Sequence, residues 1–400
     1  MKKNFNFIFI FLFLIISCKS NQIDIFSLKP SENNKNLDFR PNKWTNSEGF
    51  SIAIIPDTQS YVDVKSQTFY KKPYPINQWE IYYRQTKFIA DHSIQNGGDF
   101  AFALHVGDHV EKCSKQEFEW IADNKALNNL NNNIPFLTVP GNHDYDKWIL
   151  NKQVEGSKKY NKYLGPDSSF FKDKYWYKGS SKEGRNSYAI FNAANQKILV
   201  IGLELNPDED SIKWAQDILN QYNTLPTIIL IHQYLSSVQK NKFSKKTNEI
   251  NPNHIHNINY NFSKTNYRTL HKGWLPEQIW KDFISQNNQI FLVISGHVGT
   301  PNKGCGYRID KNKAGFTTYS FFSNFQFYNK YLSNLNLEYN KKPRDCGDGW
   351  MSVIDIDLTN KKIDFSCFNS DTGLFINQEP YMMTFPIDWN WEERFLNNKR

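Results

Sequence analysis

The sequence predicts an α/β fold, in which buried strands alternate with amphipathic helices. Short apolar runs recur along the 400-residue chain, with polar turns or helical stretches between them. Each of the main runs ends in a small group of Asp, Asn, Gln or His residues. Because open α/β sheets gather their ligand-binding loops at the carboxyl ends of strands, we expect these groups to share one edge of a sheet.

The strands that carry these polar groups are short runs dominated by Ile, Leu, Val and Phe. They are residues 50–55, 100–106, 134–139, 227–231 and 290–294. Two stretches between the strands have the apolar spacing of helices, residues 77–95 and 210–221. Further β-structure is expected at residues 186–191, 197–203 and 316–325 and in a hairpin of residues 351–357 and 362–368.

The first residues predict export from the cytoplasm. Met1-Lys2-Lys3 is a positively charged start, and residues 4–16 are mainly Phe, Ile and Leu, which is typical of a signal peptide. This run is too short for a membrane span, which needs about 20 residues. It ends at Ser17-Cys18, which resembles a bacterial lipobox. Residues 1–18 are therefore expected to be a lipoprotein signal peptide; a plain secretory signal or an uncleaved anchor is the alternative.

Lipidation at Cys18 would anchor the mature protein to a bacterial cell membrane, in the periplasm or at the cell surface. Residues 19–47 are rich in Asn, Lys and Ser and predict a flexible tether. We expect one domain at residues 48–390, with a polar insertion at about 235–272. The net charge of +8 comes from Lys dispersed among Asn, so no specific nucleic-acid binding is expected.

Four cysteines besides Cys18 could pair in an exported protein. They are Cys113, Cys305, Cys346 and Cys367. A disulfide between Cys305 and Cys346 is the first expectation, because both lie in Gly-rich segments that read as loops. Metal binding by these thiols is less favoured, because none has CxxC spacing.

The polar groups at the strand ends follow one another in a definite order. They are Asp57-x-Gln59, Gly107-Asp108, Gly141-Asn142-His143-Asp144, His232 and Gly296-His297. Singly, each Asp or Asn could be an ordinary turn or cap residue. Together, carboxylate and amide oxygens with imidazoles make the mixed ligand set of a divalent metal site.

This order resembles the calcineurin-like metallophosphoesterase family. The family signature is DxH, GD, GNH[DE], a later H and GHxH, each on a loop that follows a strand of a two-sheet β-sandwich flanked by helices. The Asp57-Thr58-Gln59 triplet resembles a bacterial, exported branch of the family. The resemblance extends over nearly all of the predicted domain.

The resemblance implies two divalent metal ions held by six side chains. The implied ligands are Asp57, Gln59, Asp108, Asn142, His232 and His297. Asp108 would bridge the ions, Asp57 and Gln59 would bind one of them, and the other three residues would bind the second. The sequence does not choose among Mn, Fe, Zn and Mg, and no other cofactor is expected.

The implied reaction is hydrolysis of a phosphoric ester. Two cations about 3.5 to 4 Å apart can clamp phosphoryl oxygens and supply a bound hydroxide for in-line attack. His143 would lie beside the metals as a proton donor or phosphate contact, oriented by Asp144. Whether the ester is a monoester or a diester stays open.

Two positions depart from the family pattern at the first metal site. Gln59 stands where a His is usual, and Gly299 replaces the second His of GHxH. A site that loses two imidazoles is expected to be weaker and to favour oxygen-loving ions. Glu111 is a candidate to help, although a local loop hydrogen bond is the favoured role for it.

Three further residues lie near the motifs. His105 precedes Gly107 within a strand and is expected to be a packed core histidine, whereas a supporting role behind the ligands stays open for His109. Arg185 could reach a phosphate, but a surface salt bridge is the favoured expectation.

The sequence therefore predicts a lipid-anchored, metal-dependent hydrolase of phosphoric esters. One alternative is a catalytically impaired lipoprotein of the same fold that binds a metal or a ligand. The other is an extracellular nuclease or nucleotide-directed phosphoesterase, which would need a contiguous basic strip that the dispersed Lys residues do not form. The sequence does not indicate an oligomeric state.

Overall fold

The computed structural model describes residues 44, 48–62, 78–123, 126–149, 153–235, 268–269, 273–297, 304–326, 347–375 and 379–396. The signal peptide, Cys18, nearly all of the tether and most of the insertion lie outside these residues and stay predictions. No helix in the described ranges has the length and apolar character needed to cross a membrane.

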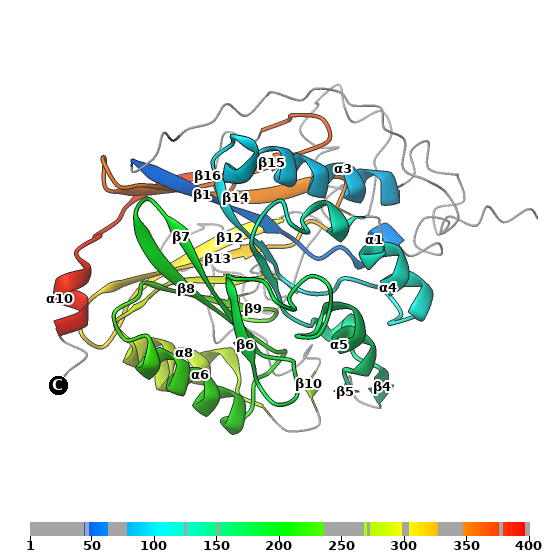
Figure 1. Ribbon diagram of the computed structural model, residues 1–400. Helices are drawn as coiled ribbons and strands as arrows, with labels where there is room; N and C mark the ends of the chain where they lie inside the picture. The colour runs from blue at the N-terminus through cyan, green and yellow to red at the C-terminus, as the bar shows by residue number, and fades with distance from the viewer. Residues whose placement is uncertain are drawn as a thin grey trace, which may run out of the picture.

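Two β-sheets pack face to face (Figure 1). The first has six strands in the order β16-β15-β14-β1-β2-β3. Their bounds are β1 (Gly49–Ile55), β2 (Phe100–His105), β3 (Phe136–Thr138), β14 (Trp350–Asp357), β15 (Lys362–Asn369) and β16 (Met382–Pro386). This arrangement confirms the predicted α/β fold with a two-sheet sandwich.

The second sheet has seven strands in the order β12-β13-β11-β9-β8-β7-β6. Their bounds are β6 (Tyr177–Ser180), β7 (Ser187–Ala193), β8 (Gln196–Leu203), β9 (Thr227–Ile231), β11 (Ile290–Ser295), β12 (Cys305–Lys311) and β13 (Thr317–Ser323). A small third sheet joins β4 (Lys147–Ile149), β5 (Gln153–Glu155) and β10 (Arg268–Thr269).

The strands that precede the polar motifs are parallel within each sheet. In the first sheet β1 pairs with β2 and β2 with β3 in parallel. In the second, β9 pairs in parallel with both β8 and β11. Parallel strands present their carboxyl ends at one edge, so the loops that follow these strands gather together.

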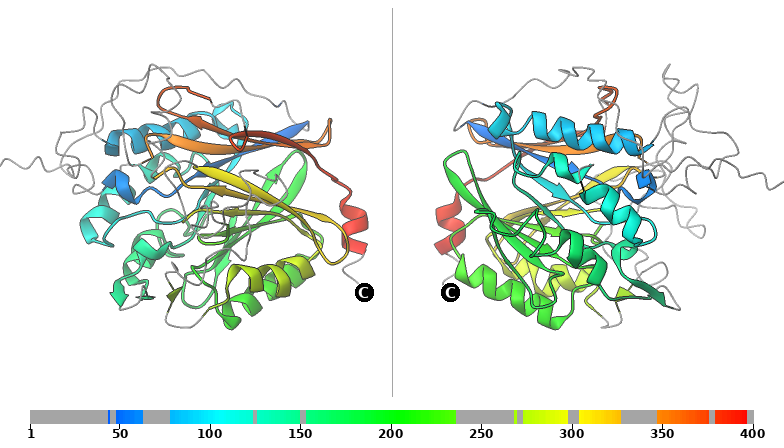
Figure 2. Two further views of the ribbon diagram at one scale, coloured as in Figure 1. Left: turned by 180° about the vertical axis from the view of Figure 1, so that it is seen from behind. Right: turned by 45° about the vertical axis from the view of Figure 1, so that its right-hand side comes forward.

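Helices cover the outer faces of the sandwich (Figures 1 and 2). Helix α3 (Gln78–Asp91) lies over the six-stranded sheet, and α6 (Glu209–Gln221) and α8 (Pro276–Asp282) lie over the seven-stranded sheet. Further helices among the described residues are α1 (Gln59–Val62), α4 (Lys115–Ala122), α5 (Lys158–Leu164) and α10 (Trp391–Leu396).

This double coverage explains why the central strands are continuous apolar runs without alternation. Along β9, Ile228 and Leu230 belong to the core between the sheets, whereas Ile229 and Ile231 pack in the cluster that includes α6 and α8. All four side chains are fully buried.

Most predicted elements appear within a few residues of their expected bounds. The predicted hairpin is β14 and β15, whose register runs from Trp350 opposite Asn369 to Asp357 opposite Lys362. The strand before Gly141 is shorter than predicted: β3 covers only Phe136–Thr138, because Pro135 and Pro140 lack the N–H that a strand ladder uses.

Two parts of the chain differ from the prediction. Cys305 does not lie in a loop but begins β12, which is stabilised by antiparallel pairing with β13. The packed unit also continues past residue 390, because Trp391 of α10 lies 5.3 Å from Phe291 between ring centroids. Both segments depend on distant partners that local patterns do not reveal.

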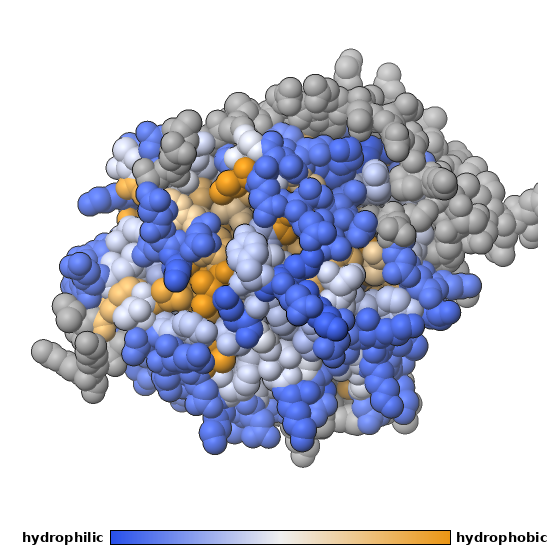
Figure 3. All heavy atoms as spheres, in the orientation of Figure 1, coloured by the Kyte–Doolittle hydropathy of each residue, from blue (hydrophilic) through white to orange (hydrophobic). Residues whose placement is uncertain are grey.

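The surface that faces the viewer in Figure 3 is mainly hydrophilic, and hydrophobic side chains are visible mostly in the region of β7 and β8. Among the described residues, the exposed large hydrophobic side chains come from separate places in the chain. They are Ile94, Tyr175, Ile309, Phe375 and Met382. Scattered exposure of this kind is ordinary for a folded domain.

Truncating an aromatic side chain between the two sheets should lower the stability of the fold. Phe365 of β15 is fully buried and stacks on Phe321 of β13, with ring centroids 4.5 Å apart and an interplanar angle of 4°. Replacing it, as Phe365→Ala, should cost about 3 to 5 kcal/mol in the free energy of unfolding, measured by chemical denaturation. Tyr175→Ala, at a side chain 69% exposed, should change it by less than about 0.5 kcal/mol. Equal effects would contradict this view of the core.

Candidate metal centre

The sequence-predicted ligands meet at one edge of the sandwich. Asp57 and Gln59 follow β1, Asp108 follows β2 and Asn142 opens the 3₁₀ turn Asn142–Asp144 after β3. From the other sheet, His232 follows β9 and His297 follows β11. Five of these six residues are almost fully buried, and His297 is partly buried.

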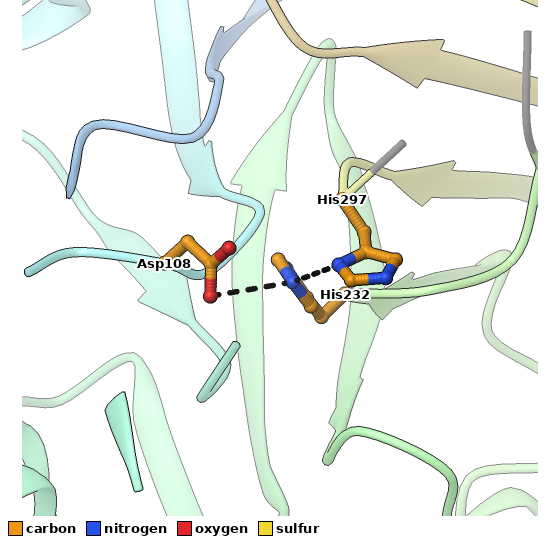
Figure 4. Close-up of side chains that lie close together, drawn as sticks. All are labelled: Asp108, His232 and His297. Carbon is orange, nitrogen blue, oxygen red and sulfur yellow. Dashed lines mark hydrogen bonds and ion pairs between the residues drawn. The ribbon is translucent and has the colours of Figure 1, made fainter. Parts of the chain in front are cut away.

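The densest part of the site holds Asp108, His232 and His297 (Figure 4). One ligand atom from each of these residues lies within 4.8 Å of the others. The Nε2 atom of His232 is 3.1 Å from His297 Nδ1 and 3.4 Å from Asp108 Oδ1. It is also 3.4 Å from the Asn142 side-chain oxygen.

A backbone hydrogen bond determines which nitrogen of His232 faces this cluster. His232 Nδ1–H donates to the Val106 carbonyl oxygen at 2.7 Å. In the neutral imidazole, Nε2 therefore carries the lone pair. That lone pair faces the oxygens of Asp108 and Asn142, so the group is stable only if a proton or a metal ion lies between them.

Asp57 and Gln59 extend the site on its other side. The Gln59 side-chain amide donates to Asp108 Oδ2 at 3.1 Å, while its Oε1 is buried with no hydrogen-bond partner among the described residues. The Asp57 carboxylate accepts the His297 backbone N–H at 3.1 and 3.2 Å. A buried, unpaired amide oxygen beside two carboxylates is a ready cation ligand.

Two glycines permit this close approach. A Cβ at position 141 would lie 2.1 Å from Asp108 Oδ1, and a Cβ at position 296 would lie 2.4 Å from Asp57 Oδ2. Any side chain at Gly141 or Gly296 would therefore clash with a carboxylate, which explains the glycines of the GNHD and GH motifs.

Burial and neighbouring charges shift the pKa values of the ligand side chains in opposite directions. Burial raises the pKa of Asp57 to about 8, while His232 opposes the rise and Asp108 adds to it. Burial alone would lower the pKa of His232, but the carboxylates of Asp108 and then Asp57 outweigh it and raise that pKa to about 9. Burial acts to raise the pKa of Asp108, yet the charges of His232 and His143 hold it below its usual value.

These observations fit divalent metal ions. The lone pairs that converge around His232 Nε2 need a positive partner, and so does the unpaired Gln59 Oε1; bound cations would supply both. The set contains imidazole, carboxylate and amide donors, which suits borderline or hard metals.

His143 lies beside this centre and is held by Glu111. Its ring Nδ1–H donates to the Glu111 carbonyl oxygen at 2.8 Å, and the Glu111 carboxylate is 3.5 Å away. Its backbone N–H donates to Asp108 Oδ1 at 2.9 Å. Burial acts to lower the pKa of His143, but Asp108 and then Glu111 outweigh it and raise that pKa above its usual value. Nε2 is thereby the ring atom able to exchange a proton.

The expectation that Asp144 orients His143 is wrong. Asp144 Oδ2 accepts from the Gly141 backbone N–H and from His109 Nδ1–H, each at 2.8 Å. Its Oδ1 accepts the His109 backbone N–H at 2.9 Å. Asp144 thus joins the loop after β2 to the loop after β3, whereas Glu111 is a described residue that does contact the His143 ring.

A stacked histidine pair supports these loops from beneath. His105 and His109 are fully buried, with ring centroids 3.9 Å apart. His105 Nδ1 accepts the Gly107 N–H, and its Nε2 lies 3.1 Å from the Thr58 hydroxyl oxygen. Burial, followed by the charges of His109 and His232, lowers the pKa of His105 well below its usual value. His105 is the packed core histidine expected from its position within a strand, and His109 supports the site through Asp144.

Other predictions fall on residues that the structure does not describe. Gly299 and Cys346 lie outside the described ranges, so neither the missing second imidazole nor the disulfide with Cys305 is tested. The Cys305 Sγ lies 3.2 Å from the Pro380 carbonyl oxygen.

Comparisons with family models, curated proteins and solved structures each find similarity to this chain. The family model for calcineurin-like phosphoesterases matches residues 50–331. The chain is 23% identical over 248 residues to the uncharacterized protein YvnB of Bacillus subtilis (strain 168), which covers 62% of this chain but only 16% of that protein. It is similar to the solved structure of purple acid phosphatase PPD1 from yellow lupin (Lupinus luteus) seeds, with 12% identity, a TM-score of 0.45, and coverage of 88% of this chain and 55% of that one. Because the family model spans more than half of the sequence, the chain belongs to the calcineurin-like phosphoesterase family.

Proposed function

We propose that this chain is a metal-dependent hydrolase of phosphoric esters, acting on monoesters or diesters. The observation that carries the proposal is the convergence of Asp108, Asn142, His232 and His297 around one imidazole nitrogen. Membership of the calcineurin-like phosphoesterase family supports the same reaction class.

The residues divide into two ligand groups that share Asp108. His232, His297 and Asn142 would hold one ion through nitrogen and amide oxygen, and Asp57 with Gln59 would hold the other through oxygen alone. When bound, such ions supply Lewis acidity that polarises the phosphoryl group and acidifies the attacking water.

His143 acts as the proton donor to the leaving group. Its Nδ1–H is committed to the Glu111 carbonyl, so the proton would be transferred at the opposite ring nitrogen. The 2.9 Å bond from its backbone N–H to Asp108 Oδ1 ties this imidazole to the metal centre.

Metal content and hydrolysis should depend on each other. The purified protein should bind two divalent ions per chain and hydrolyse generic monoester or diester substrates with at least one of Mn, Zn, Mg or Fe, and a chelator should abolish the activity. At pH 7, below the pKa values of about 8 for Asp57 and about 9 for His232, metal binding should release protons. This release should fade as pH rises through that range, and calorimetry in buffers of different ionisation enthalpy measures it.

An inactive, metal-free protein would refute the proposal. A second candidate is an impaired binding protein, which the neutral amide of Gln59 in place of a stronger ligand favours. It predicts one bound ion per chain and no hydrolysis, so the metal stoichiometry separates the two candidates.

Removing the imidazole should affect poor leaving groups most. His143→Ala should slow hydrolysis of an ester with an unactivated alkyl leaving group by about 10²- to 10⁴-fold, and much less for 4-nitrophenolate, which leaves without a proton. His92→Ala is the matched control. The Nδ1 atom of His92 also lies 2.8 Å from a backbone carbonyl oxygen, that of Phe88 in α3. If both substrates slow equally in His143→Ala, the proton-donor role is wrong.

We also propose that the protein is exported and lipid-anchored through Cys18, on the signal-peptide and lipobox pattern of residues 1–18. In the producing bacterium, Cys18→Ser should abolish lipid labelling and move the protein from the membrane fraction to the soluble fraction, with ester hydrolysis unchanged. Retention of the variant in the membrane fraction would argue for an uncleaved anchor instead.

A further inference from the structure

A second polar cluster, which none of the metal ligands belongs to, is built around the carboxylate of Glu204. This side chain directly follows β8 and is 2% exposed. Its Oε2 accepts from Arg185 Nε at 2.5 Å and from the Tyr145 hydroxyl at 3.3 Å. Its Oε1 accepts from the Ser211 hydroxyl at 2.9 Å and from the Asn186 amide at 3.4 Å. Glu204 is therefore fully engaged inside the protein.

The chain topology places this cluster at the rim of the metal centre. Leu203 pairs with Ile231 in the parallel strands β8 and β9, so Glu204 and His232 leave adjacent strands at the same end. Tyr145 directly follows the Gly141 to Asp144 motif and reaches across to Glu204. Arg185, in the segment that leads into β7, contacts this cluster through Glu204.

The guanidinium of Arg185 is held on one side only. Its Nε is bonded to Glu204, and Nη1 lies 3.8 Å from the carboxylate of Glu183, which is 65% exposed. No further hydrogen bond joins Arg185 to another described residue, and the side chain is 12% exposed. An arginine offers five N–H donors, and the hydrogen bond to Glu204 uses one of them.

Arg185 does not form the ordinary surface salt bridge that its sequence context predicts, because its partner Glu204 is buried. Glu204 is buried and also accepts from three other side chains, so this pair is held more rigidly than an ordinary surface salt bridge. A planar guanidinium fixed at Nε presents its two terminal nitrogens as a fork, which matches the geometry of a phosphate oxyanion.

We propose that Arg185 is a substrate-binding residue that contacts an anionic phosphate oxygen beside the metal centre, with Glu204 as its positioning residue. The inference rests on the proposed phosphoester hydrolase function. The oxyanion is either on the scissile phosphate or on a second phosphate carried by the leaving group, because the chemistry recognised is the same.

The test uses the metal-loaded full chain and three ligands: a phosphomonoester with an uncharged leaving group, one whose leaving group bears a second phosphate, and inorganic phosphate as an inhibitor. Arg185→Met should raise KM for at least one ester by about 10- to 100-fold, with a smaller change in kcat. Arg185→Lys keeps the charge without the fork and should give an intermediate increase.

The pattern across ligands identifies which oxyanion is bound. A higher KM for both esters and a weaker inhibition by phosphate place Arg185 at the scissile group. A higher KM for the doubly charged ester alone places it at the leaving group. Either result supports the inference. An unchanged KM for both esters with unchanged phosphate inhibition overturns it.

Arg84 of α3 provides a matched control. Its Nε lies 2.5 Å from Asp371 Oδ1 and its Nη1 lies 3.6 Å from Glu80, which is nearly the geometry of Arg185, but α3 covers the outer face of the six-stranded sheet. Arg84→Met should leave KM and phosphate inhibition unchanged. Metal content and melting temperature are measured for every variant. If the role of Arg185 is purely structural, its replacement should lower metal content and melting temperature as well as change KM. If Arg185→Met does not fold, Arg185→Lys decides.

Failure of the proposed function is recognised separately. If the wild-type protein hydrolyses no ester, the hydrolase proposal fails, and calorimetric binding of inorganic phosphate to the metal-loaded protein then tests Arg185 alone. Binding that weakens by about 10-fold or more in Arg185→Met sustains the oxyanion contact. Binding that is absent in the wild type, or equal in both proteins, overturns it.

Discussion

Parallel pairing of buried strands brings the ligands of this site together. Asp57 and His297 are 240 positions apart in the chain, yet the His297 backbone N–H donates to the Asp57 carboxylate. That contact exists because β1 and β11, in different sheets, end at the same edge of the sandwich. The apolar burial of both faces of the central strands, as at β9, holds that edge in register.

The same burial makes the site electrostatically demanding. Carboxylates and imidazoles removed from water must be paired, and around His232 Nε2 the nearest atoms include two oxygens with lone pairs of their own. Protons satisfy the group in part, as the raised pKa values of Asp57 and His232 indicate. Divalent ions would satisfy it more completely and would also use the unpaired oxygen of Gln59.

Support for the site comes in two layers of different composition. Beneath the ligands, Asp144 and the His105–His109 stack connect the loops after β1, β2 and β3 through buried hydrogen bonds. At the rim, Glu204 anchors Arg185 with part of the guanidinium still unpaired. Deep residues whose donors and acceptors are satisfied set geometry, whereas a fixed cation with unused donors is suited to recognition.

The strand runs, the hairpin of β14 and β15 and the residues that could bind metal are all predictable from the amino-acid sequence, because they follow from local periodicity and from residue type at strand ends. The partners of individual side chains are visible only in the folded chain. Asp144 bonds His109 and not its neighbour His143, His143 is held by Glu111, and Arg185 is held by Glu204. Such contacts depend on how loops from separate strands meet, and the spacing of residues along one chain carries no information about that meeting.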